Sequence, residues 1–188
     1  TDLGRKIFYV NRPRIDTSSN FRVHCSETEQ TIILGCYKSG QGIYMYGVTD
    51  SRLNGIVEVT AAHEMLHAAY DRLNGEQLQR VNELTRQAAA QLTSERLLKT
   101  IEQYRAKDPH SVPDELHSIL GTEVAELPAE LEGHYRQYFT DRRKVVSLAR
   151  QYESEFDSRS RQVAALTSRL SALKTDIENA SAELLQRQ

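Results

Sequence analysis

The sequence predicts an α+β protein in which a small N-terminal β-sheet is followed by a helical core and a long C-terminal coiled-coil helix. Up to about Asp50, β-branched and aromatic residues come in short bursts separated by Gly, Ser, Asn and Pro. After that the apolar residues follow helical spacing, and from Val145 they form a regular stripe. The chain has 188 residues, 39% of them hydrophobic, which suits one compact domain with an extension. We assign residues 1–140 to the domain and residues 141–188 to the helical extension.

The expected strands are the four bursts of β-branched and aromatic residues. They cover residues 6–10, 21–24, 31–34 and 43–46. Cys25 and Cys36 flank the third burst and could face each other across a hairpin. If they pair, the domain matures in an oxidising compartment, and an extracytoplasmic position with an anchor outside these residues would follow. If they stay reduced, a cytosolic protein is equally compatible with the spacing.

The expected helices have recognisable start and stop signals. The first is capped by Asn54 and runs to Leu73, where Asn74 and Gly75 end it. Two more cover residues 76–92 and 95–107, the latter capped by Ser94. A fourth opens near Pro113, where the spacing of Ser111 and Asp114 resembles a capping box, and closes by residue 127.

The C-terminal segment carries an apolar stripe with alternating spacings of four and three residues. Its positions run through Val145, Ala149, Tyr152, Phe156, Val163, Leu166, Leu170, Leu173, Ile177, Ala180 and Leu184, with Arg159 as the one charged slot. This pattern is typical of a coiled coil. The helix would either pack back on its own domain or pair through residues 145–184 with a second copy or another helix.

Charge and hydropathy exclude several partners. The 24 basic and 26 acidic residues give a net charge of −2 without a long run of either sign, so we expect neither nucleic acid nor an anionic membrane as a partner. No apolar run approaches the roughly 18 residues of a membrane-spanning helix. The chain starts without Met and ends inside a helical repeat, which suggests a piece of a longer protein.

The segment with the strongest chemical signal is His63-Glu64-Met65-Leu66-His67. On a helix the two histidines are about 40° apart around the axis and one turn apart along it, so both imidazoles can reach one ion. Two nitrogen ligands suit Zn²⁺, and the neighbouring carboxylate of Glu64 can take a proton from a bound water. The alternative is an amphipathic helix whose histidines face a polar groove.

Two histidines leave such a site one protein ligand short. The candidates are Glu115, His117 and Glu123 on the helix near Pro113. Glu115 and His117 point about 200° apart and cannot bind the same ion. Glu123 falls within the apolar stripe of this helix and would be costly to bury without a cation or a donor. Glu115 could be a solvated acid in the first turn, so the residues alone favour Glu123.

From about Ile43 to Leu127 the chain resembles the gluzincin class of zinc peptidases, in a minimal bacterial form similar to the ImmA/IrrE type. The first match is residues 63–67. The others are Pro113-Asp114-Glu115 with a small residue, Ser118, three positions later, and Pro128. The resemblance implies a zincin-like core, Zn²⁺ bound by His63, His67 and Glu115, and Glu64 as general base. It also implies an edge strand, here 43–46, that holds an extended peptide.

The function expected from this resemblance is hydrolysis of peptide bonds in a peptide or protein substrate. Zinc activates a water, Glu64 takes its proton, the hydroxide attacks the carbonyl, and Glu64 returns the proton to the leaving amine. His134, Tyr135 and Tyr138 are candidates for an oxyanion donor, although core packing explains the tyrosines better. The alternative function is a non-catalytic, zinc-stabilised assembly module that acts through its coiled coil.

Overall fold

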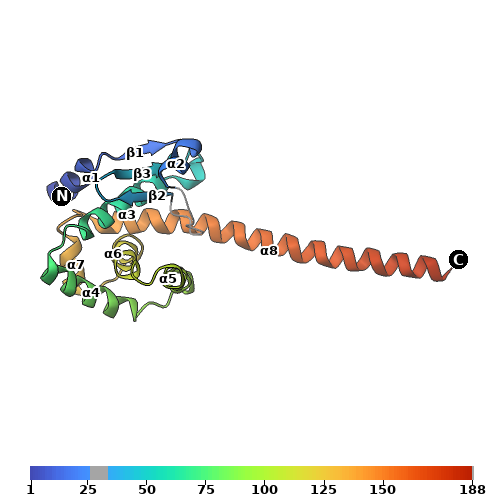
Figure 1. The fold of residues 1–188 in the computed structure, drawn as a ribbon. Helices are drawn as coiled ribbons and strands as arrows, with labels where there is room; N and C mark the ends of the chain where they lie inside the picture. Colours follow the sequence, from blue (N-terminus) through green and yellow to red (C-terminus); the bar gives the residue numbers. More distant parts are fainter. Residues whose placement is uncertain (26–33, 188) are drawn as a thin grey trace.

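The computed structural model describes residues 1–25 and 34–187 and has the expected α+β composition (Figure 1). A three-stranded sheet forms one layer, and helix α3 (Ile56–Tyr70) packs beneath it. On the other side of α3 lie the remaining core helices α4 (Gly75–Ala89), α5 (Glu95–Lys107), α6 (Val112–Glu123) and α7 (Ala129–Tyr135). Helix α3 is therefore buried between the sheet and α6, which explains why ten of its fifteen residues are buried.

The sheet has the strand order β1-β3-β2. The central strand β3 (Gly42–Tyr46) pairs in parallel with β1 (Arg14–Asp16) and antiparallel with β2 (Gly35–Lys38). Ile43 and Met45 are buried in the main core, which confirms the expected strand at 43–46. The expected strand at 31–34 lies outside the described residues except for Leu34.

Two of the four expected strands are helices instead. Residues 6–10 belong to α1 (Asp2–Val10), where the Thr1 hydroxyl caps the first turn by accepting from the Gly4 N–H. Only one side of this segment is covered: Ile7 is buried, whereas Tyr9 and Val10 are 66% and 61% exposed. Residues 21–24 lie in α2 (Ser18–His24). Both segments are rich in residues that favour strands, but packing along one side of a helix outweighs that preference.

The helix boundaries follow the capping signals in part. The Asn74 side chain and Gln77 form a reciprocal capping box at the start of α4, and Ser94 caps α5. Two expected caps were wrong. The short helix η1 (Ser51–Leu53) precedes α3, whose N-cap is Gly55 rather than Asn54. Gly55 has φ +92°, which favours glycine, and Leu148 packs so closely against it that a side chain would collide. Ser111 precedes α6 but makes no side-chain capping bond.

Helix α6 is held in place at its C-terminal end by Arg142. The guanidinium is buried and forms an ion pair with Glu132. It also donates hydrogen bonds to the carbonyls of Val124 and Ala125, at 2.5 and 2.9 Å, just beyond the end of α6. These carbonyls have no partner within the helix, so Arg142 satisfies them. The start of the C-terminal helix thereby fixes the helix that carries the expected third ligand.

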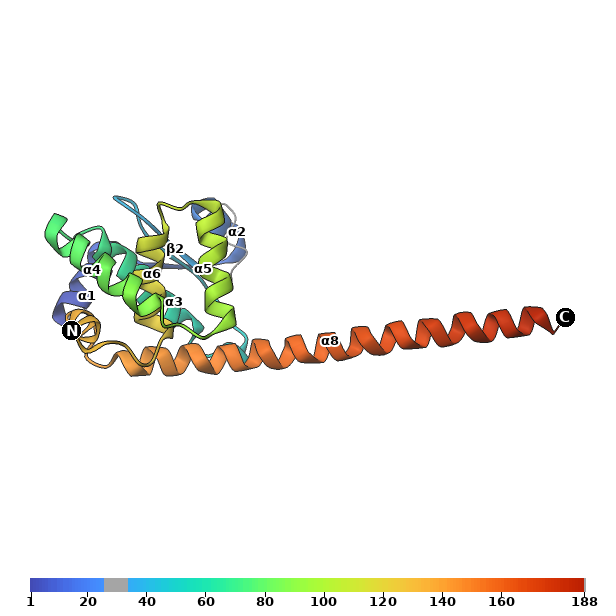
Figure 2. The same ribbon diagram turned by 90° about the horizontal axis from the view of Figure 1, so that it is seen from below.

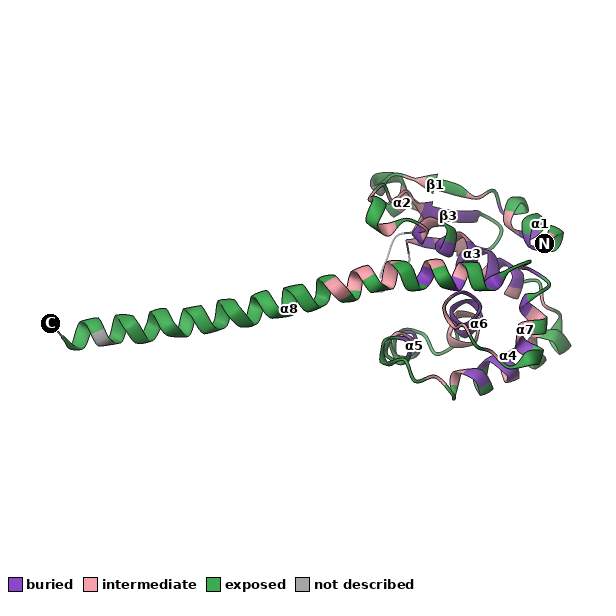
Figure 3. Ribbon diagram, turned by 180° about the vertical axis from the view of Figure 1, so that it is seen from behind, coloured by how far each residue is buried: buried purple, intermediate pink, exposed green. Residues whose placement is uncertain are grey.

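The C-terminal helix α8 (Arg142–Gln186) begins inside the domain and projects far beyond it (Figure 2). Val146 and Ala149 are buried against the core, but every residue from Arg159 to Ala182 is exposed (Figure 3). The first part of the helix packs back on the domain, which is one of the two expected arrangements. Pairing of the exposed part with a second copy or another helix stays a prediction.

Cys25 at the end of α2 and Cys36 on β2 form a disulfide, with 5.9 Å between the Cα atoms. The bond ties α2 to the sheet and is compatible with an extracellular location. Among the helices that the structure describes, none has both the length and the apolar character needed to span a membrane.

Candidate metal centre

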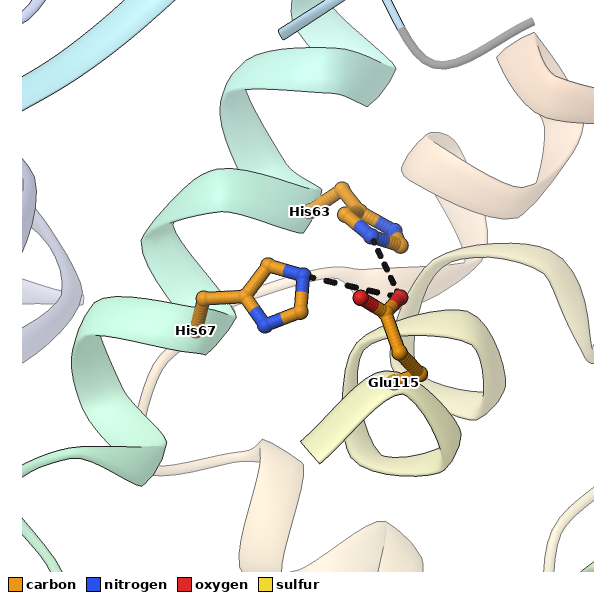
Figure 4. Close-up of side chains that lie close together, drawn as sticks. All are labelled: His63, His67 and Glu115. Carbon is orange, nitrogen blue, oxygen red and sulfur yellow. Dashed lines mark ion pairs between the residues drawn. The ribbon is translucent and has the colours of Figure 1, made fainter. Parts of the chain in front are cut away.

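Helices α3 and α6 bring together His63, His67 and Glu115 (Figure 4). The two imidazoles project from consecutive turns of α3, and the carboxylate reaches them from the first turn of α6. One Glu115 oxygen, Oε2, lies 3.8 Å from Nε2 of each histidine. The possible ligand atoms of the three residues all lie within 4.8 Å of one another, so the cluster could hold a metal ion.

Two further side chains surround the cluster. Oδ1 of Asp114 lies 2.8 Å from Nδ1 of His67 and so occupies the nitrogen that faces away from Glu115. The hydroxyl of Tyr104, on α5, interacts with the carboxylate of Glu115 and helps to lower its pKa. Ligand side chains in metal sites are commonly oriented by such neighbouring polar groups.

The possible ligand atoms of these three side chains are better placed to bind a cation than to pair with one another. Nε2 of His63 and Oε2 of Glu115 are buried, yet neither has a hydrogen-bond partner within the described chain. Leaving such atoms unpaired is costly, and a metal ion would satisfy both at once. Two imidazole nitrogens and one carboxylate oxygen form a ligand set typical of catalytic zinc sites. The residues present therefore fit the expected metal.

The electrostatics of the cluster also favour positive charge. Burial opposes a charge on His67, but Asp114, Glu115 and Glu64 outweigh it and raise the pKa of His67 to about 10. Burial likewise opposes protonation of His63, but the facing Glu115 carboxylate raises its pKa. Burial would raise the pKa of Glu115, but His63 and His67 lower it. The carboxylates that attract protons to the imidazoles would equally stabilise a divalent cation in their place.

Glu64 lies on α3 beneath strand β2. Its side chain is buried, and burial raises its pKa, an effect that the two histidines and the backbone N–H of Tyr37 partly offset. Gly35 is the residue of β2 that makes room for it: a Cβ there would lie 2.9 Å from Oε1 of Glu64 and would also collide with Thr60. The carboxylate is therefore held between the metal-binding face of α3 and the backbone of β2.

The strand beside this site is β2 and not 43–46 as expected. Strand β3 (Gly42–Tyr46) is the central strand, with a neighbour on each side, so its backbone groups are already paired. Strand β2 pairs with β3 alone within the described residues, and the Tyr37 N–H faces Glu64. The expectation failed because the sequence shows the apolar content of a strand but not its position in the sheet.

The other candidate ligands lie elsewhere. Glu123 forms an ion pair with Arg96, which supplies the donor that its burial requires. His117 is fully buried and faces away from the cluster, with its Nε2 atom 2.9 Å from Nε2 of His134. Of the three alternatives, the structure brings only Glu115 to the two histidines.

The three candidate oxyanion donors are occupied in a different part of the core. His134 pairs with His117, and burial lowers the pKa of His134 to about 4. The Tyr135 hydroxyl donates to the carbonyl of His117, at 2.7 Å. Tyr138 is buried beside them, which agrees with core packing for both tyrosines.

Sequence reasoning missed Asp114, Tyr104 and the strand β2 as parts of this site. Asp114 was visible only as the acidic residue before Glu115, a position that the helix dipole already explains. Tyr104 is one of three buried positions spaced along α5, Leu97, Ile101 and Tyr104, and has no motif around it. Comparison of the chain with protein-family models, with curated proteins and with solved structures finds no match.

Proposed function

We propose that this protein is a zinc metallopeptidase of the gluzincin type with a zincin-like core. The observation that carries the proposal is the position of Glu64 between two features. On one side its carboxylate interacts electrostatically with the cluster of His63, His67 and Glu115. On the other side it lies against the backbone of β2. A site that only stabilised the fold would not need a buried carboxylate at this position.

In this proposal His63, His67 and Glu115 hold the ion. Bound zinc would supply Lewis acidity, which acidifies water and polarises a carbonyl group. Glu64 accepts a proton on its carboxylate and later returns it to the amine of the leaving peptide. Burial raises the pKa of Glu64, which brings it closer to the range where a carboxylate both accepts and donates protons near neutral pH. Asp114 and Tyr104 orient two of the ligands.

The substrate peptide would lie along β2. Within the described residues, no strand pairs with the edge of β2 that lies away from β3. That edge carries backbone groups beside Glu64, and an extended peptide could add to it as a further strand. Hydrogen bonds to the main chain would then place a carbonyl near the metal without requiring a particular side chain. This arrangement favours an unfolded or flexible segment as substrate.

Two measurements test the proposal. The purified protein should hold about one equivalent of zinc when no chelator is used, and less than about a tenth would contradict the metal site. Glu64→Gln should keep the zinc but lower cleavage of labelled casein by at least roughly 100-fold. Glu58→Gln, on the exposed side of the first turn of α3, is the matched control and should cleave normally. Cleavage that survives in Glu64→Gln would show that the assigned base is wrong.

A second candidate function is a zinc-stabilised assembly module that acts through α8. The exposed apolar stripe of this helix favours it, since Leu166, Leu170 and Ile177 are each about two-thirds exposed. Zinc binding with no cleavage by the wild-type protein, and thermal stability that depends on zinc equally in wild type and Glu64→Gln, would support this second function.

A further inference from the structure

The projecting half of α8 exposes a continuous apolar face. Thirteen large apolar side chains are exposed in the described chain, and seven of them lie on this half of α8. Six follow the apolar face, Val163, Leu166, Leu170, Leu173, Ile177 and Leu184, and Leu185 lies beside it. From residue 159 to 186 the helix extends over about 40 Å (Figures 1 and 2), and residues 159–182 are all exposed within the part of the chain that the structure describes. An exposed apolar face of this length is typical of a helix that packs against another helix.

The spacing defines heptad positions. Val163, Leu170 and Ile177 occupy position a, and Leu166, Leu173 and Ala180 occupy position d. The flanking positions carry few charges. Arg169, Asp176 and Glu183 are at position g, and Lys174 is at position e. These four charged positions distinguish the possible orientations of two copies, because every orientation buries much the same apolar side chains.

In a parallel pair, position g of one helix faces position e of the next heptad in the other. Arg169 would then face Lys174 of the second copy, twice by symmetry, and repel it.

An antiparallel pair centred between Ser171 and Ala172 instead places Arg169 opposite Asp176 of the second copy, also twice. Leu170 then packs against Leu173 and Leu166 against Ile177, and the Lys174 position faces the uncharged Thr167. Position 183 faces the uncharged Gln162 in this register. Shifting the pair by one heptad in one direction places Arg169 against itself. Shifting it in the other direction places Arg169 opposite Glu183, but it also places Asp176 and Lys174 each against its own copy.

We propose that the projecting half of α8 binds a second copy of this chain as an antiparallel two-stranded coiled coil in this register. Among these arrangements, only this one has attractive charge pairs and no repulsive ones, as a self-complementary two-fold symmetric interface requires. The two domains then lie at opposite ends of the shared coiled coil, each with its own metal centre. This inference does not depend on the proposed function.

Cysteine cross-linking tests the orientation. Both native cysteines are in the disulfide, so single cysteines can be added without other free thiols. An equimolar mixture of Leu166→Cys and Ile177→Cys should form a mixed disulfide dimer on mild oxidation, because these positions meet in the antiparallel register. Leu166→Cys alone should stay uncross-linked. A dimer from Leu166→Cys alone would show a parallel pair and overturn the proposal.

Charge reversal gives a second test, measured by sedimentation equilibrium. Arg169→Glu should weaken the dimer by roughly 5- to 30-fold, because two attractive pairs become repulsive, and adding Asp176→Arg should restore it. In a parallel pair Arg169→Glu would strengthen the dimer. Arg161→Glu, the same change on the side of the helix away from the stripe, is the matched control. A wild-type chain that stays monomeric at about 100 µM, where even a Kd of about 10 µM would give mostly dimer, would overturn the proposal.

Discussion

Oδ1 of Asp114 lies 2.8 Å from Nδ1 of His67, while Nε2 of the same imidazole faces Glu115 at 3.8 Å. A metal ion that replaces the proton on Nε2 would leave the remaining proton on Nδ1, where the Asp114 carboxylate holds it. Asp114 and Glu115 are neighbours in the first turn of α6. One helix start therefore supplies both a ligand and the group that orients another ligand.

Replacing Asp114 should weaken zinc binding without unfolding the protein. Asp114→Asn removes the charge that orients His67, and loss of such a group typically costs 10- to 100-fold in metal affinity. Competition with a chromogenic zinc chelator would measure this. Asp108→Asn, the same change at an exposed position before α6, should bind zinc as the wild type does. Equal affinity in the Asp114 variant would show that His67 is oriented by packing alone.

The third ligand can be identified by comparing two glutamates of α6. Glu115→Ala should lose most of its zinc, because it removes one of three donor atoms. Glu123→Ala should keep its zinc and lose at most about 1 kcal/mol from the free energy of unfolding, since its partner Arg96 is 43% exposed. Zinc content after gel filtration distinguishes the two variants. Full zinc content in Glu115→Ala would refute the ligand assignment.

Gly35 should matter for turnover rather than for zinc. In Gly35→Ala the new methyl group meets Oε1 of Glu64 and the side chain of Thr60, so either β2 or the Glu64 carboxylate must move. Misplacing a catalytic group by about 1 Å can cost roughly 100-fold in rate, so we expect kcat to fall by roughly 10- to 100-fold with zinc retained. Gly75→Ala, where no atom lies within 4 Å, is the control. Unchanged kcat in Gly35→Ala would argue against a role for Glu64.

The parts of this protein that could be predicted from sequence are those set by local spacing. The helical spacing of His63 and His67 predicts that they share one side of α3, and the structure has them on consecutive turns. The start of α5 after Ser94 follows from a capping side chain. The long C-terminal helix follows from its apolar stripe, because that period extends over many turns.

The rest depends on contacts between distant segments. Residues 6–10 have the composition of a strand, but the Thr1 cap and the packing of Ile7 and Gly4 make them helical. Glu123 fits the apolar stripe of α6 as well as any ligand would, and only its ion pair with Arg96 explains its burial. The helix pattern alone favoured Glu123, which does not lie beside the two histidines. The choice of Glu115 therefore required the resemblance to a family.

The pair formed by buried His117 and half-buried His134 should make the metal-free protein sensitive to acid. Burial lowers the pKa of His134 to about 4, from 6.5 when it is exposed, so between these values the unfolded chain binds more protons than the folded one. Stability contributed by the neutral imidazole is therefore present above about pH 6.5 and is lost as the pH falls towards 4. Urea unfolding of chelator-treated protein at pH 7 and pH 5 measures this loss.

His134→Gln removes one titrating group and should reduce the loss of stability between these pH values. His110→Gln changes an exposed histidine between α5 and α6 and should leave that loss unchanged. If His134→Gln loses as much stability as the wild type between these pH values, protonation of the buried pair does not limit the folded state in acid.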